Sequence, residues 1–239
     1  MSALFALSSY SMAAEEPKLP TAWRGTNVTQ SRVCRINVAT SALQEAMDML
    51  NQTDGQFHNG TYADAGVLYA QMVEFDRLTN HTKYKHKLKH YFKATLSNKS
   101  GFLDHQVISI YNECFPATDF RMIAAGWAAY KTYNDSEFLE YAEASWASAR
   151  RYTISQEQAM LGTIETKNFT LATCNETLAG GTYSNTDTNS TDLDSLASGM
   201  FFVVSALLAN VTSNNTYTDA AIQSLYFITS LLQSPSDYT

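Results

Sequence analysis

The stretch LTNHTKY, residues 78–84, recurs as TYNDSEF at residues 132–138 and more loosely as TSNNTY at residues 212–217. Each copy combines asparagine with serine or threonine and ends in an aromatic residue. Asparagine is typical of a turn that ends a helix, serine or threonine can cap the next helix, and the aromatic side chain can pack on its first turn. This repeat predicts stacked α-hairpins, in an open solenoid or a closed α/α ring.

Apolar residues recur at every third or fourth position on both sides of these loops, the pattern of helices with one buried face. Seven such stretches start at Ile36, Leu68, Tyr84, Phe120, Phe138, Leu193 and Tyr217. A short eighth helix is expected at Ser155, because Ser155 and Gln158 have the spacing of a capping box. The sequence therefore predicts an all-α fold with a Gly/Thr/Asn-rich insertion over residues 161–191.

The helix predicted after Phe120 is rich in alanine and contains Gly126. Small side chains let neighbouring helix backbones approach closely. Because glycine costs up to about 1 kcal/mol of helix propensity relative to alanine, Gly126 is expected to serve tight packing. Trp127 and Trp146 fall on apolar helix stripes, so both are predicted to be core residues.

Eleven of the fifteen asparagines begin an Asn-x-Ser/Thr triplet, the acceptor of N-linked glycans. This density predicts a secreted, N-glycosylated protein whose sequons mark its surface. Residues 1–14 are interpreted as a signal peptide or its remnant, with one domain over residues 15–239. The longest apolar run, residues 196–209, is shorter than the roughly twenty residues of a spanning helix. No membrane span is therefore expected.

Composition excludes several classes of partner and chemistry. A formal net charge of −7 disfavours nucleic acid and anionic membranes. Three cysteines, Cys34, Cys114 and Cys174, allow at most one internal disulfide, and their spacing matches no metal site. His86 and His90 share a helix face, but the lysines around them would repel a cation, so a solvated basic face is the better interpretation.

Carboxylates are the remaining candidates for catalysis, since glycosidic cleavage needs one acid on the leaving oxygen and a second at the anomeric carbon. Asp104, Glu113 and Asp119 lie in or beside the irregular segment that leads into the small-residue helix. Asp119 is the best-placed of them, although it can equally be that helix's N-cap or first-turn acid. Glu74 and Asp76 face different directions on one helix and are not expected to share a site.

Aromatic side chains supply the other half of a sugar site, because flat rings stack on sugar faces. Tyr183 follows Gly180 and Gly181, so the backbone there can approach a ligand while the ring projects from the insertion. The two glycines can instead form a simple turn. Tyr111 is a further candidate for substrate binding, and no metal or cofactor is predicted.

These segments taken together resemble the fungal proteins of glycoside hydrolase family 76, the α-1,6-mannanase-like family, and particularly a basidiomycete group. The likeness runs from about Pro20 to Leu232. It is carried by the stretches LPTAW (19–23), DGQF (54–57), YAQMVEFDRLTN (69–80), AYKTYND (129–135), LAGGTY (178–183), SLASG (195–199) and VSALL (204–208). The resemblance implies an (α/α)6 toroid that cleaves α-1,6-mannan internally, with adjacent aspartates as nucleophile and general acid in a retaining reaction without a cofactor.

The chain departs from the family pattern in two ways. The stretch that corresponds to the family's tandem aspartates reads Ala117-Thr118-Asp119, and no Asp-Asp pair occurs anywhere in the sequence. Seven or eight helices are also fewer than the twelve of a closed ring, which predicts an incomplete toroid. A non-catalytic protein that binds cell-wall glycans, or a helical interaction scaffold, are therefore alternatives to the hydrolase.

Overall fold

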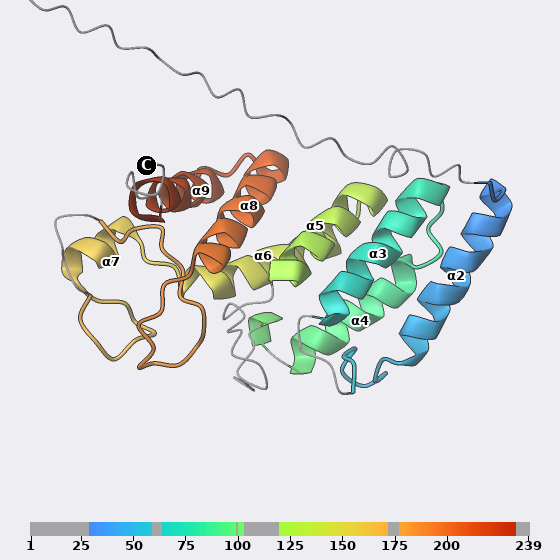
Figure 1. Cartoon of the computed structure of the whole chain (residues 1–239), viewed down its shortest axis with the longest axis horizontal. Coiled ribbons are helices and arrows are strands. Elements are labelled where there is room, and N and C mark those ends of the chain that lie inside the picture. The colour runs from blue at the N-terminus through green and yellow to red at the C-terminus, as the bar shows by residue number, and fades with distance from the viewer. Residues whose placement is uncertain (1–28, 59–63, 99, 103–119, 172–176, 233–239) are drawn as a thin grey trace, which may run out of the picture. The chain divides into compact units, whose positions relative to one another are not determined.

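The computed structural model describes residues 29–58, 64–98, 100–102, 120–171 and 177–232. This part of the chain is all-helical, as predicted, with isolated β-bridges in place of strands (Figure 1). Its α-helices are α2 (Arg32–Asp48), α3 (Asp64–Thr79), α4 (Lys85–Asn98), α5 (Phe120–Tyr133), α6 (Ser136–Arg150), α7 (Gln156–Leu161), α8 (Ser195–Thr212) and α9 (Asn215–Phe227). Two short elements, η1 (Ser100–Phe102) and η2 (Ile228–Leu232), accompany them.

The chain divides into two compact units, residues 1–38 and 39–239, and α2 begins in the first and ends in the second. Within the first unit, Cys34 is exposed and carries a free thiol. Cys114 and Cys174 lie outside the described residues, so the disulfide prediction concerns positions that the structure does not describe. The packing described below is that of residues 39–239.

Within the described residues of this unit, each of the three repeated loops joins two helices into a hairpin. The pairs are α3 with α4, α5 with α6, and α8 with α9. Asn80, Asn134 and Ser213 adopt the left-handed conformation at the turns, with φ of 57°, 48° and 54°. The aromatic residues that close the loops, Tyr84, Phe138 and Tyr217, are all buried, as expected.

The helix caps in these loops differ from the expected serine and threonine. Asp135 caps α6 by accepting from the backbone N–H of Glu137, and Asn214 caps α9 by accepting from that of Thr216. These two side chains stand one or two positions before the predicted Ser136 and Thr216, and aspartate and asparagine are equally good capping residues. The predicted capping box at α7 is confirmed, with Ser155 and Gln158 bonding to each other's backbone.

Aromatic side chains hold the hairpins together. Phe92 of α4 stacks on Tyr141 of α6 with ring centroids 5.3 Å apart and contacts the edge of Phe138 at 5.9 Å. Trp146 of α6 stacks on Phe201 of α8, and its indole N–H donates to Ser205 at 2.8 Å. The core position predicted for Trp146 is therefore confirmed, and α6 connects the second hairpin with the third.

Gly126 allows α5 and α6 to approach closely. A Cβ at this position would lie 3.0 Å from the carbonyl oxygen of Phe138 and 3.2 Å from the Cβ of Ala142. Both neighbours belong to α6. The packing explanation for this glycine is confirmed.

Helix α8 extends beyond the apolar run of residues 196–209 to 18 residues. By length and composition it alone, among the helices of the described residues, could cross a membrane, and a core helix of a soluble protein has the same character. One face of α8 packs in the core through Phe201, Val204 and Leu208.

Candidate functional site

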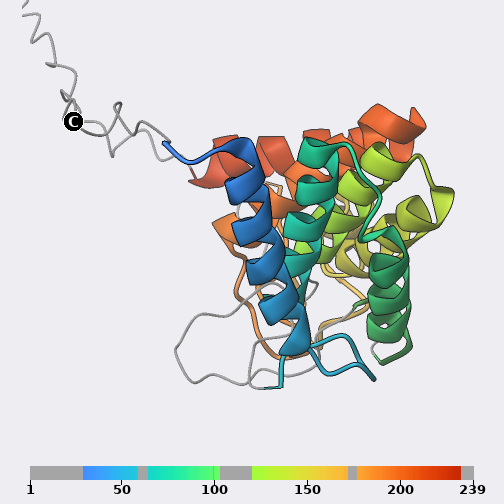
Figure 2. The same cartoon turned by 90° about the vertical axis from the view of Figure 1, so that its right-hand side faces the viewer.

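The described parts of the loop after α2 and of the insertion after α6 lie at the lower end of the view in Figure 2, and we refer to this end as the long-connection end. At this end the hydroxyl of Tyr69, near the start of α3, donates to the carbonyl of Gly55 at 2.6 Å. The insertion after α6 reaches the start of α8, where the backbone N–H of Thr182 donates to Ser198 at 3.0 Å. This end therefore combines the start of α3 with the loop after α2, and the start of α8 with the insertion.

The loop after α2, which carries the quoted stretch DGQF, is held by hydrogen bonds to two helices. Gly55 has φ of +70°, and a Cβ there would lie 2.6 Å from the Tyr69 hydroxyl. The amide of Gln56 donates to the hydroxyl of Thr95 on α4 at 3.0 Å. The Oε1 atom of Gln56 is buried and has no hydrogen-bond partner among the described residues. Sequence patterns did not identify Gln56, because its partner lies 39 residues away.

The predicted acids Asp104, Glu113 and Asp119, together with Tyr111, lie outside the described residues. The structure does describe the residues on either side of the segment 103–119 that contains them. Phe102 is fully buried before it, and α5 begins at Phe120 directly after it. The roles of these four residues therefore stay predictions.

The two glycines of the insertion accommodate a helix. A Cβ at Gly180 would lie 2.1 Å from the carbonyl oxygen of Gln223 on α9, and the hydroxyl of Ser224 donates to the Gly180 carbonyl at 3.0 Å. A Cβ at Gly181 would lie 2.8 Å from the ring of Phe227. The element that closely approaches these two glycines is therefore α9. The glycines also take part in a turn, which was the alternative prediction from the sequence.

The ring of Tyr183 does not project from the insertion, contrary to expectation. It is 1% exposed, packs in a cluster with Ile154, Ile164 and Leu171, and contacts the edge of Phe169. Burial raises the pKa of its hydroxyl to about 12. The apolar residues of the insertion pack around this ring because burial removes their apolar surface, and that of the ring, from water. Substrate binding by Tyr183 stays a prediction.

A buried lysine lies against Tyr183. The Nζ atom of Lys167 is 4.4 Å from the ring centroid and donates to the backbone carbonyls of Asn185 at 3.1 Å and Asp187 at 2.6 Å. Burial lowers the pKa of Lys167, and the nearby carboxylates of Asp187 and Asp192 oppose that effect. Its acceptors are backbone atoms, which no sequence motif reveals.

Glu74, Asp76 and Asp194, three other carboxylates of the described residues, have structural partners. Glu74 forms an exposed pair with Arg77, whereas Asp76 is fully buried and accepts from the backbone of Tyr84 and the hydroxyl of Tyr133, both at 2.8 Å. They face different directions, as predicted. Asp194 is the N-cap of α8. No group of three potential metal ligands occurs in the part of the chain that the structure describes.

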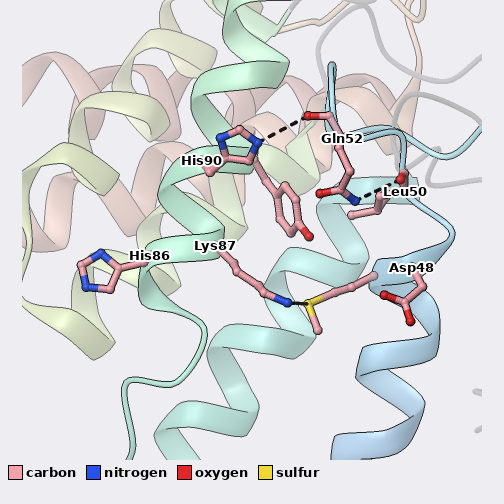
Figure 3. Close-up of a pocket in the computed structure, with 8 residues that line it drawn as sticks. Asp48, Leu50, Gln52, His86, Lys87 and His90 are labelled. Carbon is pink, nitrogen blue, oxygen red and sulfur yellow. Dashed lines mark hydrogen bonds between the residues drawn. The ribbon is translucent and has the colours of Figure 1, made fainter.

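A cleft of about 570 Å³ opens beside the long-connection end, between the end of α2 and the outer side of α4 (Figure 3). The cleft is lined by eight side chains: Met47, Asp48, Leu50, Gln52, His86, Lys87, His90 and Tyr91. The two histidines predicted on a solvated face are indeed exposed, and a ring nitrogen of His90 lies 3.4 Å from the carbonyl of Gln52. The cleft beside these histidines was not predicted from the sequence.

The fold of this chain is similar to that of a solved family 76 glycoside hydrolase from a bovine strain of Bacteroides thetaiotaomicron, with a TM-score of 0.52 and 14% identity. The match covers 85% of this chain and 44% of the hydrolase, so the chain spans less than half of that structure's length. No family model matches the chain, and no curated protein matches it in sequence. The likeness is one of fold: the chain has a helical architecture like that of a family 76 glycoside hydrolase.

Proposed function

We propose that this protein is a secreted, family-76-like glycoside hydrolase that acts on α-1,6-mannan or a related cell-wall polysaccharide. The observation that carries the proposal is the fold, which is similar to that of a family 76 glycoside hydrolase. The quoted stretches that resemble fungal members of the family support it from the sequence. Binding and catalytic residues often lie on loops that a rigid scaffold positions, and this chain has long connections between its helices.

The proposed chemistry needs two carboxyl groups. Asp119, directly before α5, is the first candidate, and Asp104 or Glu113 is its proposed partner. One carboxylic acid protonates the glycosidic oxygen as its bond to the anomeric carbon breaks, and the other carboxylate attacks or stabilises that carbon. Water then completes the cleavage within the chain of the polysaccharide. This reaction requires no cofactor.

Export and glycosylation belong to the same proposal. Eight sequon asparagines lie in the described residues, and Asn80, Asn98, Asn134, Asn168, Asn189, Asn210 and Asn214 are exposed, while Asn51 is half-buried. An acceptor asparagine has to be accessible to carry a glycan. Their exposure therefore supports N-glycosylation, and with it passage through the secretory route after removal of a signal peptide.

The test of catalysis is the release of mannose oligomers from α-1,6-mannan. Replacing Asp119 by asparagine should lower turnover by at least about a hundredfold, because a lost acid or base typically costs that much. Asp219→Asn is the matched control, since Asp219 is an exposed residue of α9, close to the short turn between α8 and α9. Unchanged turnover in Asp119→Asn would remove this residue from the mechanism.

A second candidate function is glycan binding without catalysis, and the lack of any Asp-Asp pair in the sequence favours it. This function predicts retention of the protein on insoluble mannan with no released product. Tyr183→Ala is a poor probe of it, because the buried ring supports the insertion and its removal would unfold that segment. Product release by the unaltered protein would exclude this alternative.

A further inference from the structure

The cleft between α2 and α4 has no part in the proposed cleavage. None of its lining residues belongs to the segments that carry the predicted acids or the insertion. Its floor is apolar, since Met47, Leu50 and Tyr91 are at most 4% exposed. Its rim is polar and consists of the exposed side chains Asp48, Gln52, His86, Lys87 and His90.

The lysine of the rim is unlike its neighbours on α4. Lys85 and Lys89 bind Asp135 of the α5–α6 turn at 2.9 Å and 2.8 Å. Lys87 instead extends over the cleft floor, where its Nζ lies 4.0 Å from the Sδ of Met47 (Figure 3). Within the described ranges it forms no ion pair, so its ammonium group is available to a ligand.

The carboxylate of Asp48 contributes the opposite charge. It accepts a hydrogen bond from Gln44, one turn earlier on α2, at 2.7 Å. It forms no ion pair with Lys87 or with any other cation in the part of the chain that is described. The cleft therefore presents one anionic and one cationic group that do not neutralise each other by contact.

This combination of charges favours a ligand without net charge. An ion of either sign would be attracted by one of the two groups and repelled by the other, so it would gain little from them together. A neutral molecule with neighbouring hydroxyl groups can donate to the carboxylate and accept from the ammonium group, while its C–H surface packs on the apolar floor. We propose that this cleft is a surface binding site for a neutral saccharide.

Its volume supports the proposal, since sites for small molecules are typically about 300 to 1,000 Å³. The side-chain amide of Gln52 lies at the rim, where it donates to the Leu50 carbonyl at 3.1 Å. The exposed imidazole of His90 adds a further group that exchanges hydrogen bonds with hydroxyls, whereas the ring of His86 points away from Lys87 and Asp48 (Figure 3). The inference rests on the proposed function only in the choice of a mannoside among the probes.

The experiment follows the methyl group of Met47 by NMR in protein labelled with methyl-¹³C methionine. Methyl α-mannoside, maltose and cellobiose are titrated separately, and at least one should shift the Met47 resonance with a Kd on the order of 1 mM, as expected for an open cleft. Asp48→Asn and Lys87→Met should each weaken binding at least about fivefold, since each removes a hydrogen bond to a charged group. Glu45→Gln and Lys93→Met are matched controls on the same helices, outside the cleft, and should leave the Kd unchanged.

Two results would overturn the site: no shift of Met47 by any of the three saccharides, or a shift produced by inorganic phosphate alone, which would make it an anion site. Hydrolysis is measured separately, as released product. A protein that moves the Met47 resonance but yields no product would contradict the proposed hydrolase and leave this site intact. A protein that releases product but shows no shift of the Met47 resonance would support the proposed hydrolase and contradict this binding site.

Discussion

At the scale of single residues, glycines mark the places where two backbones meet. The close helix packing at Gly126 is predictable from the sequence, because this glycine stands among alanines on one apolar helix, and such small side chains also allow close packing. The partner of Gly180 is not, since the backbone that it admits, at Gln223, lies 43 positions further along the chain. Local composition therefore indicates that a glycine packs closely, but it does not indicate which segment of the chain the glycine packs against.

Gly126→Ala should destabilise the protein. The new methyl group would lie 3.0 Å from the carbonyl oxygen of Phe138, and the clash should outweigh the gain in helix propensity of about 1 kcal/mol. We expect a net loss of about 1 kcal/mol and a Tm lower by a few degrees in thermal unfolding.

Gly199→Ala is the matched control, because an added Cβ on α8 meets nothing within 4 Å. It should gain up to about 1 kcal/mol from helix propensity alone. An equal rise of Tm in both variants would show that α5 and α6 are not in close contact at Gly126.

At the scale of elements, the three short turns repeat one design and the long connections do not. Helix periodicity and the Ser155 capping box were readable from the sequence, because both depend on residues within one turn of each other. The pairing of α4 with the α5–α6 turn was not, since Lys89 reaches Asp135 and Glu137 from another hairpin. The burial of Tyr183 was missed for the same reason: its neighbours come from across the insertion.

The ion pairs at this turn predict a dependence of stability on pH. The ammonium groups of Lys89 and Lys85 lower the pKa of Asp135 from 3.8 to about 2. Because the folded pKa lies below the unfolded one, this stabilisation is present above about pH 4 and is lost as the pH falls toward 2. Partial exposure limits the effect to about 1 kcal/mol.

Asp135→Asn separates the charge from the cap, since asparagine keeps the oxygen that accepts from Glu137. Chemical unfolding at pH 6, 4 and 2 should show this variant less stable than the natural protein at pH 6 and equal to it at pH 2. A difference that is the same at all three pH values would mean that the ion pairs contribute nothing.

At the scale of the whole molecule, the sequence predicted the fold more fully than the site. The all-helical class and the hairpins followed from periodicity and repeated loops, and a family 76 hydrolase has a similar fold. The loop after α2 is held by contacts such as that of Gln56 with Thr95, which leave no periodic signal in the sequence. Asp104, Glu113 and Asp119 fall in or beside an irregular segment of the sequence and lie outside the described residues, so their arrangement stays a prediction.

The central claim is that saccharide binds at the end formed by the long connections. Hydrogen exchange, followed by mass spectrometry with and without an α-1,6-mannan oligosaccharide, measures this directly. The account predicts slower exchange in peptides that cover residues 101–119 and 178–194, and no change at the short turns near Asn80, Asn134 and Ser213. Protection of the short turns, with none at the long connections, would contradict it.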